Sequence, residues 1–471
     1  MSEGTTAPRL SRKTLFYYSL ADLPVAMSLF PVMVFLPKFY TANLGVPLML
    51  AANIILLVRV FDIITDPLMG VVSDRTRSRW GRRRPWVALA TPILMLCIFM
   101  LFLPPEGAGA VHLGVWMALL SIGTTMFMIP YYAWGAELST DYNERSAVAG
   151  ARSMMGVVGS LLAQLIPAIA LIAFGLGGSD TVLTLVGITM LVTMPVCAVL
   201  TLTKVREAPN FVNSVVPFTE GLALMARNGP FLRLVGAFMV GSLALSMTTP
   251  LYLFFITFVL GAEEMAIFML TFFYAANFAS IPFWVWLSTK IGKHRAYAAS
   301  FCLIAVAHPL YMLLGAGDFW WMTPITLMTG FAAGGFNALP NSMKADVIDL
   351  DTLHSGESRA ALFFSSWSFT QKMAGSLGGW LALMVLGFIG FDAKTPTNNG
   401  ADELLGLRLL FSTIPSLFYL GAAAIIWNYP ITRERHAEMR AELALVSPDA
   451  SQAGPGRADA PAIAATASGG H

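Results

Sequence analysis

Apolar stretches long enough to cross a lipid bilayer recur along the whole of this chain of 471 residues. Crossing a hydrocarbon core of roughly 30 Å takes about 20 mainly apolar residues in a helix. The composition agrees, because 56% of the residues are hydrophobic, 12% are charged and the mean hydropathy is +0.68. The sequence therefore predicts an all-α integral membrane protein with 12 transmembrane helices. The predicted spans are residues 14–40, 47–73, 85–104, 111–138, 147–175, 180–203, 230–259, 263–288, 294–315, 319–342, 360–390 and 405–428.

Basic residues gather on one side of the predicted membrane. Most of the 29 Lys and Arg fall in the two termini and in the loops that follow even-numbered spans. Because basic loops are retained on the cytoplasmic side, we expect a multi-pass protein of the cell membrane, or inner membrane, with both termini cytoplasmic. The net charge of +2 is too balanced to indicate nucleic-acid binding. The lipid bilayer is the partner that the composition predicts.

An internal repeat is visible at an offset of about 210 residues. The sequence Gly-Arg-Arg-Arg at 81–84 corresponds to Gly-Lys-His-Arg at 292–295, and Ala-Glu-Leu at 136–138 corresponds to Ala-Asp-Val at 345–347. Transporters are commonly built from two related six-helix halves, which this repeat predicts. The expected parts are an N-terminal half at 1–203, a cytoplasmic linker at 204–229, a C-terminal half at 230–428 and a cytoplasmic tail at 429–471 that is disordered from about 445.

The second predicted span carries three charged residues, Arg59, Asp62 and Asp66. An ionised side chain at mid-bilayer costs about 2.5–3.5 kcal/mol on insertion scales, so each one needs a partner or a wet cavity. Asp62 and Asp66 are one turn apart on one helix face, so either one is protonated or a cation lies between them. With the hydroxyl of Thr65 they offer the hard oxygen ligands of a sodium site. A salt-bridge cluster with Arg59 is the alternative.

Lys372 lies near the middle of the predicted span 360–390 and should seek a carboxylate, with Asp62 and Asp66 as the candidates. Such a contact would let cation binding and helix packing compete for the same acids, which makes Arg59 and Lys372 candidate coupling residues. A static ion pair between the halves is the alternative. Lys372 and the nearby Trp367 are also candidate substrate contacts.

Asp22 and Arg152 are further charges inside predicted spans of the first half. Carboxylate and guanidinium groups offer paired hydrogen bonds to vicinal hydroxyls or to an acidic substrate group. A structural pair between the two residues is the alternative. Tyr132 near the end of the fourth span could stack on a sugar ring, although aromatic residues in membrane helices more often pack or anchor.

The loop after the second span is rich in arginine and starts with Asp74 and Arg75. It lacks the strand, glycine-rich turn and helix of a nucleotide-binding P-loop. We expect its charges to pair with Glu137 and Asp141 when the cytoplasmic mouth is closed, and so to act in gating. No nucleophile and base arrangement or metal motif indicates an enzyme, and we expect no cofactor.

Two segments resemble the glycoside-pentoside-hexuronide:cation symporters of the major facilitator superfamily, the family that includes the melibiose permease. The first is Asp-Ile-Ile-Thr-Asp-Pro at 62–67 with Ser-Asp-Arg-Thr-Arg-Ser-Arg-Trp-Gly-Arg-Arg-Arg-Pro-Trp at 73–86. The second runs from Ala-Asp-Val-Ile-Asp at 345–349 through Gly-Glu at 356–357 to Gln-Lys at 371–372. The resemblance covers both halves and implies the fold of that superfamily.

The resemblance also implies roles for single residues. Asp62 and Asp66 match the family's cation-site acids, Thr125 matches a cation-site threonine, and Lys372 matches the lysine near that site. Asp22, Arg152 and Tyr132 fall at positions of sugar contacts. Met128 departs from the pattern, because a further acid stands there in the melibiose permease, and this change argues against galactoside specificity.

These observations predict a monomeric secondary active transporter that couples uptake of a sugar or glycoside to a Na⁺ or H⁺ gradient by alternating access. The coupling ion is the expected small inorganic partner, and the sequence leaves Na⁺ and H⁺ both open. The resemblance reaches lysophospholipid carriers more distantly, so a carrier of an amphiphilic substrate such as a lysophospholipid is the alternative.

Overall fold

The computed structural model describes residues 10–139, 142–207, 228–355, 360–431 and 438, and its regular structure is helical throughout these residues. The first group of helices is α1 (Arg12–Ser19), α2 (Asp22–Lys38), the π-helical η1 (Phe39–Asn43), α3 (Leu48–Arg75), α4 (Arg84–Phe102), α5 (Ala110–Glu137), α6 (Tyr142–Phe174) and α7 (Ser179–Lys204). The second group is α9 (Gly229–Phe254), η2 (Phe255–Leu260), η3 (Glu263–Met265), α10 (Ala266–Ile291), α11 (Lys293–Ala307), η4 (His308–Leu313), η5 (Phe319–Trp321), α12 (Met322–Ser355), α13 (Ala360–Phe388), η6 (Pro396–Asn398), α14 (Ala401–Arg408), η7 (Leu409–Thr413) and α15 (Ile414–Trp427).

Ten helical segments of the described residues are long and apolar enough to cross a membrane. They coincide with ten of the predicted spans. The other two predicted spans, 319–342 and 360–390, fall on α12 and α13, which have 34 and 29 residues and so exceed the length that a bilayer requires. The all-α membrane fold is confirmed, and the count of twelve crossings stays a prediction that these lengths fit.

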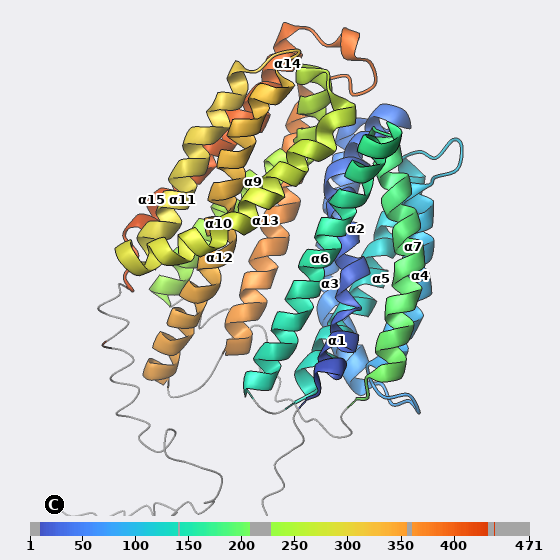
Figure 1. Cartoon of the computed structure of the whole chain (residues 1–471), viewed down its shortest axis with the longest axis vertical. Coiled ribbons are helices and arrows are strands. Elements are labelled where there is room, and N and C mark those ends of the chain that lie inside the picture. Colours follow the sequence, from blue (N-terminus) through green and yellow to red (C-terminus); the bar gives the residue numbers. More distant parts are fainter. Residues whose placement is uncertain (1–9, 140–141, 208–227, 356–359, 432–437, 439–471) are drawn as a thin grey trace, which may run out of the picture.

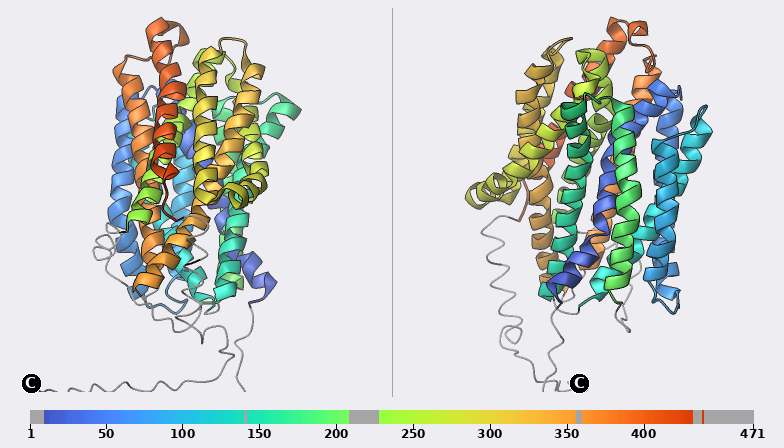
Figure 2. Two further views of the ribbon diagram at one scale, coloured as in Figure 1. Left: turned by 90° about the vertical axis from the view of Figure 1, so that its left-hand side faces the viewer. Right: turned by 45° about the vertical axis from the view of Figure 1, so that its right-hand side comes forward.

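The two groups of helices form two bundles that stand side by side (Figure 1). The same packing pattern occurs in both bundles, which is the structural form of the sequence repeat. α10 crosses the face of its bundle obliquely, while most other long helices run along the height of the molecule (Figures 1 and 2). The matching pairs are α2–α6 with α9–α13, α2–α7 with α9–α15, α3–α5 with α10–α12, α4–α5 with α11–α12, and α4–α7 with α11–α15.

Details of the two bundles repeat as well. The first long helix of each bundle ends in a π-helical segment, η1 after α2 and η2 after α9. The loop motifs that revealed the repeat also pair within their own bundles. Arg83 Nη2 lies 2.8 Å from Glu137 Oε1, and Lys293 Nζ lies 2.7 Å from Asp346 Oδ2. The repeat therefore preserves an ion pair as well as a helix order.

Local chemistry sets where several helices begin and end. The side chain of Asn228 accepts a hydrogen bond from the backbone N–H of Phe231 at 3.0 Å and caps α9. Gly261 ends η2 in the left-handed conformation with φ of 69°. Gly292, with φ of 91°, forms the one-residue turn between α10 and α11. Glycine suits both turns because it has no β-carbon.

The bundles have two ends, which we call the linker side and the far side. The linker side holds the end of α7 at Lys204 and the start of α9 at Gly229, and the far side holds η1, η2 and α14 (Figure 1). The bundles pack against each other through α3 with α13, α6 with α10, and α2 with α9. We call the first two contacts the α3–α13 seam and the α6–α10 seam. The repeat relates these two seams to each other.

Candidate functional site

The two acids of α3 face two hydroxyl groups of α5. Asp62 Oδ1 accepts a hydrogen bond from the hydroxyl of Ser121, and Asp66 Oδ1 accepts one from the hydroxyl of Thr125 at 2.8 Å. Acids and hydroxyls are both four residues apart on adjacent helices, so one turn of α3 matches one turn of α5. Sequence reasoning missed Ser121, although its spacing from Thr125 repeats the spacing of the acids and could have revealed it.

The second oxygen of each acid faces a basic group. Asp62 Oδ2 lies 3.4 Å from Arg59 Nη1 on the same helix, and Asp66 Oδ2 pairs with Lys372 Nζ of α13. The Arg59 pair stays within α3, whereas the Lys372 pair crosses the α3–α13 seam between the bundles. The side chains of Lys372 and Asp66 are 40% and 21% exposed, against 6% for Asp62. Asp66 is therefore the more accessible acid.

The cluster holds two acids and two bases, so its charges balance without a further ion. A cation or proton that binds an acid must compete with the basic partner of that acid. Thr65 donates to the backbone carbonyl of Asp62 at 3.4 Å, so its hydroxyl turns toward its own helix. Among the described residues no group of three or more His, Cys, Asp or Glu is placed to hold a metal ion. Two carboxylates with the oxygens of Ser121 and Thr125 are the oxygen donors gathered here.

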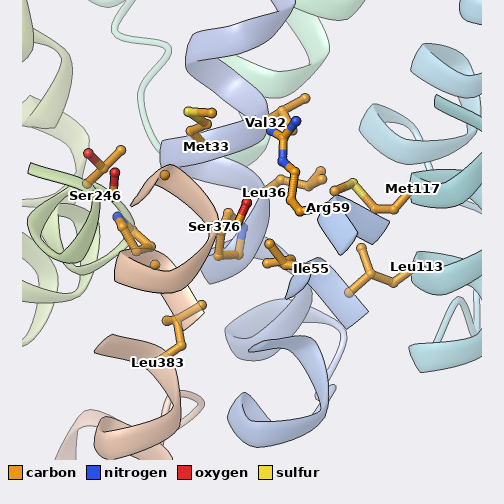
Figure 3. A pocket seen from close by; sticks show the side chains of 15 residues that line it. Val32, Met33, Leu36, Ile55, Arg59, Leu113, Met117, Ser246, Ser376 and Leu383 are labelled. Atoms are coloured by element: carbon orange, nitrogen blue, oxygen red, sulfur yellow. The ribbon is translucent and has the colours of Figure 1, made fainter. Parts of the chain in front are cut away.

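A small cavity of about 70 Å³ adjoins this cluster. Figure 3 shows Arg59 in it, among Val32 and Leu36 of α2 and Ser376 of α13. A larger cavity of about 470 Å³ lies next to it and reaches deep into the second bundle. The residues that line both cavities are Met33, Ser246, Thr249 and Gly375. The two cavities therefore share a wall, and Arg59 is the residue of the charged cluster that lines the smaller one.

Asp22, Arg152 and Tyr132 lie together. Arg152 Nε is 3.6 Å from Asp22 Oδ2, and its guanidinium carbon lies 3.8 Å from the centre of the Tyr132 ring. The lining of the large cavity begins with Ser160 on α6, eight residues beyond Arg152. At 1.5 Å per residue, Arg152 is roughly 12 Å away from it along the helix, toward the linker side. The three predicted substrate residues therefore lie on the linker side of the cavity and outside its lining.

The structure places Trp367 in the apolar core of the second bundle. It is 6% exposed, its ring centroid lies 4.0 Å from that of Phe238, and Lys344 Nζ lies 4.4 Å from its ring centre. Phe238 in turn lines the large cavity. Trp367 therefore supports the cavity wall from behind.

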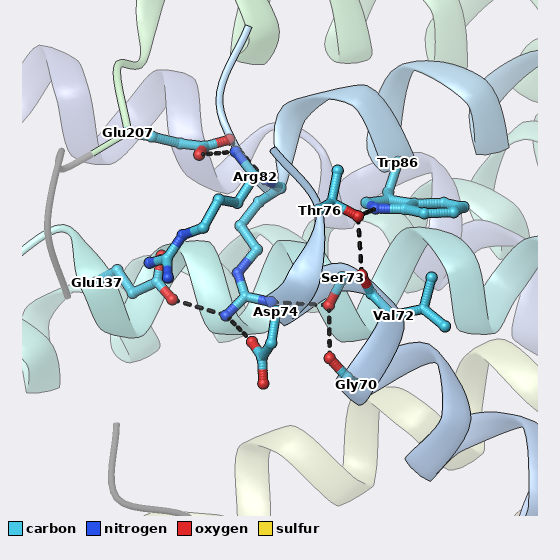
Figure 4. A network of polar contacts seen from close by, with 10 residues as sticks. Gly70, Val72, Ser73, Asp74, Thr76, Arg82, Trp86, Glu137 and Glu207 are labelled. Atoms are coloured by element: carbon cyan, nitrogen blue, oxygen red, sulfur yellow. Dashed lines mark hydrogen bonds and ion pairs between the residues drawn. The ribbon is translucent and has the colours of Figure 1, made fainter. Parts of the chain in front are cut away.

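A charge network occupies the linker side of the first bundle (Figure 4). The Arg83 guanidinium contacts Asp74, Glu137 at 2.8 Å and the Ser73 hydroxyl at 2.7 Å, and Arg82 lies 3.3 Å from Glu137. Burial acts to lower the pKa of Arg83, but the hydrogen bonds and charges of Glu137 and Asp74 outweigh burial and raise it. These partners all belong to the first bundle, so these contacts join helices of one half.

A further acid, outside the predicted gating set, holds the arginine loop in place. Glu207, just beyond α7, accepts backbone hydrogen bonds from Arg82 at 2.6 Å and from Arg83 at 2.9 Å, and so fixes the arginine loop against α7. Sequence reasoning did not single out Glu207. Arg75 is exposed at the end of α3, and Asp141 lies outside the described residues.

A buried ion pair joins the bundles at the far side. Lys38 at the end of α2 pairs with Glu263 of η3, and Glu263 also accepts a hydrogen bond from the Ser179 hydroxyl at 2.9 Å. The Lys38 side chain is 3% exposed. The two partners are more than two hundred residues apart in the sequence, so no local spacing indicates this contact.

Comparisons with known proteins place the chain in a family. A family model described as "MFS/sugar transport protein" matches residues 17–433. The sodium-dependent lysophosphatidylcholine symporter 1-B of Danio rerio is 26% identical, over 92% of this chain and 90% of that protein. The glucuronide carrier protein homolog of Escherichia coli K12 is 25% identical, over 92% of this chain and 96% of that protein.

Among solved structures, a mutant of the nucleoside transporter NupG superposes with a TM-score of 0.63 at 13% identity, covering 89% of this chain and all of that one. This likeness concerns the fold. The family consists of membrane transporters and not enzymes, and the relative from Danio rerio is by its name a sodium-dependent symporter. The chain belongs to the MFS/sugar transport protein family of the major facilitator superfamily.

Proposed function

We propose that the chain is a secondary active transporter that couples uptake of a sugar or glycoside to a Na⁺ or H⁺ gradient by alternating access. The observation that carries this proposal is the ion pair between Asp66 of α3 and Lys372 of α13. It links an acid in the membrane to the contact between the two halves. An ion that binds the acid therefore changes the packing of the halves.

The coupling step follows from this arrangement. An incoming ion reaches Asp66, the more exposed acid, and displaces Lys372. The carboxylates of Asp62 and Asp66 and the hydroxyl oxygens of Ser121 and Thr125 then surround a sodium ion, or Asp66 takes up a proton. Freed from Asp66, Lys372 no longer holds α13 to α3, and the halves can rearrange around the substrate.

The substrate route runs between the halves. Asp22, Arg152 and Tyr132 supply a carboxylate, a guanidinium and a ring at the linker side of the large cavity, a combination that suits a hydroxylated substrate. With the linker side in the cytoplasm, as the basic loops indicate, the buried pair of Lys38 and Glu263 closes the outer end. On this proposal the state is inward-facing, and the pairs of Arg83 with Asp74 and Glu137, which lie within one half, stay formed while the inner end is open. The halves at 1–203 and 230–428 then move as the two rocking units.

A second candidate is a cation-coupled carrier of an amphiphile such as a lysophospholipid. The similarity to the lysophosphatidylcholine symporter of Danio rerio, across nearly the whole chain, supports it. The glucuronide carrier homolog supports a sugar derivative over an equal length. Competition by lysophosphatidylcholine against a bound glycoside separates the two candidates.

Uptake into proteoliposomes tests the proposal. Purified protein should accumulate a radiolabelled glycoside from a panel of glucosides, galactosides, xylosides and glucuronides when a Na⁺ or H⁺ gradient is imposed. Asp62→Asn combined with Asp66→Asn should abolish accumulation. Asp402→Asn, which changes an exposed acid of α14, is the matched control and should leave it intact. Gradient-driven accumulation by the double variant would refute the coupling site.

A further inference from the structure

The arginine run between α3 and α4 divides into two parts. Arg82 and Arg83 turn inward to Glu137 and belong to the charge network of the first bundle (Figure 4). The arginines of the other part are exposed, and none of them has an ion pair with a described carboxylate. These are Arg75, Arg77 and Arg79. The charge network therefore leaves three cations of this run available to a partner outside the chain.

The end of α7 adds two more exposed cations at the same place. Glu207 accepts backbone hydrogen bonds from Arg82 and Arg83 at 2.6 Å and 2.9 Å, so the chain just beyond α7 lies against the arginine loop. Lys204 and Arg206, which come just before Glu207, are exposed and have no ion pair with a described carboxylate. We call the five exposed cations the basic rim: Arg75, Arg77, Arg79, Lys204 and Arg206. The basic rim thus joins two segments that are far apart in the sequence.

The basic rim lies where the apolar outer surface of the first bundle ends. Exposed apolar side chains recur every three or four residues along α3, and Arg75 occupies the next position of that stripe. A similar stripe runs along α7 and is followed by the exposed Lys204 and Arg206. The members are Leu57, Phe61, Ile64, Leu68 and Val71 on α3, and Ile188, Val192, Val196 and Val199 on α7. Apolar surface that gives way to charge marks the headgroup level of a bilayer.

Trp80 provides an apolar group beside these charges, and its side chain is 66% exposed. Its backbone N–H donates to the Ser78 hydroxyl at 3.1 Å, and that hydroxyl donates to the backbone carbonyl of Gly81 at 2.7 Å. The ring N–H of Trp86 donates to the Thr76 hydroxyl at 2.9 Å (Figure 4). These bonds fix the loop, while Trp80 and the arginines beside it stay exposed. Tryptophan is enriched at membrane interfaces because its ring is apolar and its N–H is polar.

The corresponding turn of the second half has a different surface. α10 continues to Ile291 and Gly292 alone joins it to α11, whereas the loop 76–83 joins α3 to α4. When the glycines of the two loop motifs are matched, the counterparts of the three exposed arginines are Trp286, Ser288 and Lys290. The fold therefore needs neither the longer loop nor its arginines to connect these helices, which indicates that they serve another purpose.

We propose that the basic rim binds the headgroups of anionic phospholipids such as phosphatidylglycerol, with Trp80 at the boundary between headgroups and acyl chains. A guanidinium group donates paired hydrogen bonds to phosphate oxygens, and every Lys or Arg near an anionic membrane surface adds to the attraction. With the linker side in the cytoplasm, the basic rim meets the anionic lipids of the inner leaflet. Lipid binding requires no substrate and no gradient, so its test is independent of the proposed transport.

Lipid titration of the full-length protein in a nonionic detergent, followed by native mass spectrometry, tests the proposal. The probes are dioleoyl phosphatidylglycerol, dioleoyl phosphatidylcholine and glycerophosphoglycerol, which is the anionic headgroup without acyl chains. Phosphatidylglycerol should bind about tenfold or more tightly than phosphatidylcholine, and an equal concentration of the free headgroup should not displace it. Equal affinities for the two lipids would refute the proposal. Displacement by the free headgroup would show a site for soluble phosphates and would also refute it.

Two pairs of substitutions locate the site. Arg77→Gln with Arg79→Gln should weaken phosphatidylglycerol binding about tenfold or more, because each arginine near an anionic surface contributes roughly fivefold. Phosphatidylcholine binding should not change. Lys290→Gln with Arg295→Gln is the matched control, since it removes two exposed cations at the linker side of the second half, and it should leave both affinities nearly unchanged. Equal weakening by the two pairs would mean that the lipid responds to net charge alone, which would refute the site.

Two further variants separate charge from shape and ring. Arg77→Lys with Arg79→Lys keeps the charge and should retain most of the affinity for phosphatidylglycerol. Trp80→Ala keeps every cation of the basic rim and should weaken both lipids by a similar factor, because the indole contacts acyl chains; it also provides the test if the glutamine pair at the loop does not fold. Unchanged binding of both lipids by Trp80→Ala would contradict the position given to the indole.

Discussion

The two seams between the halves are related by the repeat, yet they carry opposite chemistry. The α3–α13 seam holds Asp66 and Lys372, with Asp62 and Arg59 beside them. The α6–α10 seam presents Gln164, Phe273 and Asn277 to a large cavity whose described lining lacks Asp, Glu, Lys and Arg. The two seams are related by the repeat, but the α3–α13 seam carries charged side chains and the α6–α10 seam carries neutral polar and aromatic ones.

The repeat makes the contrast specific to single positions. The loop motif that follows α3 at Gly81 recurs after α10 at Gly292, and at the same spacing Asp62 and Asp66 of α3 correspond to Phe273 and Asn277 of α10. The linker-side ion pairs, by contrast, survive in both halves. Charges that stabilise a half are thus kept, whereas charges inside the membrane occur where the ion would act. Under the proposed coupling, the ion acts at the α3–α13 seam, which we call the ion seam, whereas the α6–α10 seam, which we call the neutral seam, faces a cavity whose described lining holds no Asp, Glu, Lys or Arg.

The largest expected effect is that of Asp66→Asn. Without a charged acid, Lys372 loses its partner across the α3–α13 seam and, under the proposed coupling, the cation loses a ligand. Gradient-driven accumulation should fall to the equilibrium level in proteoliposomes, while counterflow without a gradient persists. If Gln164→Leu, on the α6–α10 seam, also abolished gradient-driven accumulation, the assignment of the ion to the α3–α13 seam would be wrong. Asp402→Asn serves again as the control.

The far-side pair offers the next largest effect. Lys38→Met leaves Glu263, whose side chain is 28% exposed, without its buried base, and removing one partner of a partly buried pair is destabilising. We expect a loss of about 2–3 kcal/mol in unfolding free energy, measured by denaturant titration in detergent. The double variant with Glu263→Gln should lose less than the single one. Because this pair lies outside the ion seam, accumulation by the variant should still require the cation gradient. Accumulation without a gradient would contradict the assignment of the ion to the α3–α13 seam.

A double-mutant cycle on the ion seam comes third in size. Asp66→Asn, Lys372→Gln and their combination should give a coupling of about 1–2 kcal/mol in thermal stability, since Lys372 is 40% exposed and solvent screens the pair. The same cycle with Arg59→Gln in place of Lys372→Gln should give a smaller coupling to Asp66, because Arg59 pairs with Asp62. Equal couplings would mean that the four charges act as one undivided cluster.

Much of the fold and the ion seam could be predicted from the sequence, for physical reasons. A bilayer forces long apolar helices, so hydropathy alone located the spans. The one-turn spacing of Asp62 and Asp66 and the isolated charge of Lys372 indicated a shared site, since charges in a membrane need partners. The structure brings these three residues together with Thr125. Their roles in ion binding stay a prediction.

The neutral cavity could not be predicted, because its wall has no distinctive local pattern. Phenylalanine, serine and threonine are common in any membrane helix, and only packing shows which of them face a void. Gln164 becomes notable only when its oxygen is seen to lack a partner. The contact of Lys38 with Glu263 depends on how two halves meet, which no local spacing records.

The smallest effect concerns an acid of the second half that lies on neither seam. Asp392, in the loop between α13 and α14, accepts hydrogen bonds from the Asn398 side chain at 2.6 Å and from the Lys394 backbone at 2.8 Å, which hold its pKa below the usual value. Its carboxylate therefore stabilises the folded loop above the unfolded pKa of about 3.9, and this contribution is lost as the pH falls through the lower, folded value.

Asp392→Asn should thus lower the melting temperature slightly at pH 7, and the difference from the unmodified protein should shrink below about pH 4. Melting curves at pH 7, 5 and 3.5 measure it. Accumulation driven by either gradient should be unchanged, because the loop lies outside both seams. If Asp392→Asn altered the cation requirement of transport, acids of the second half would also take part in coupling, and the assignment of the ion to the α3–α13 seam alone would be wrong.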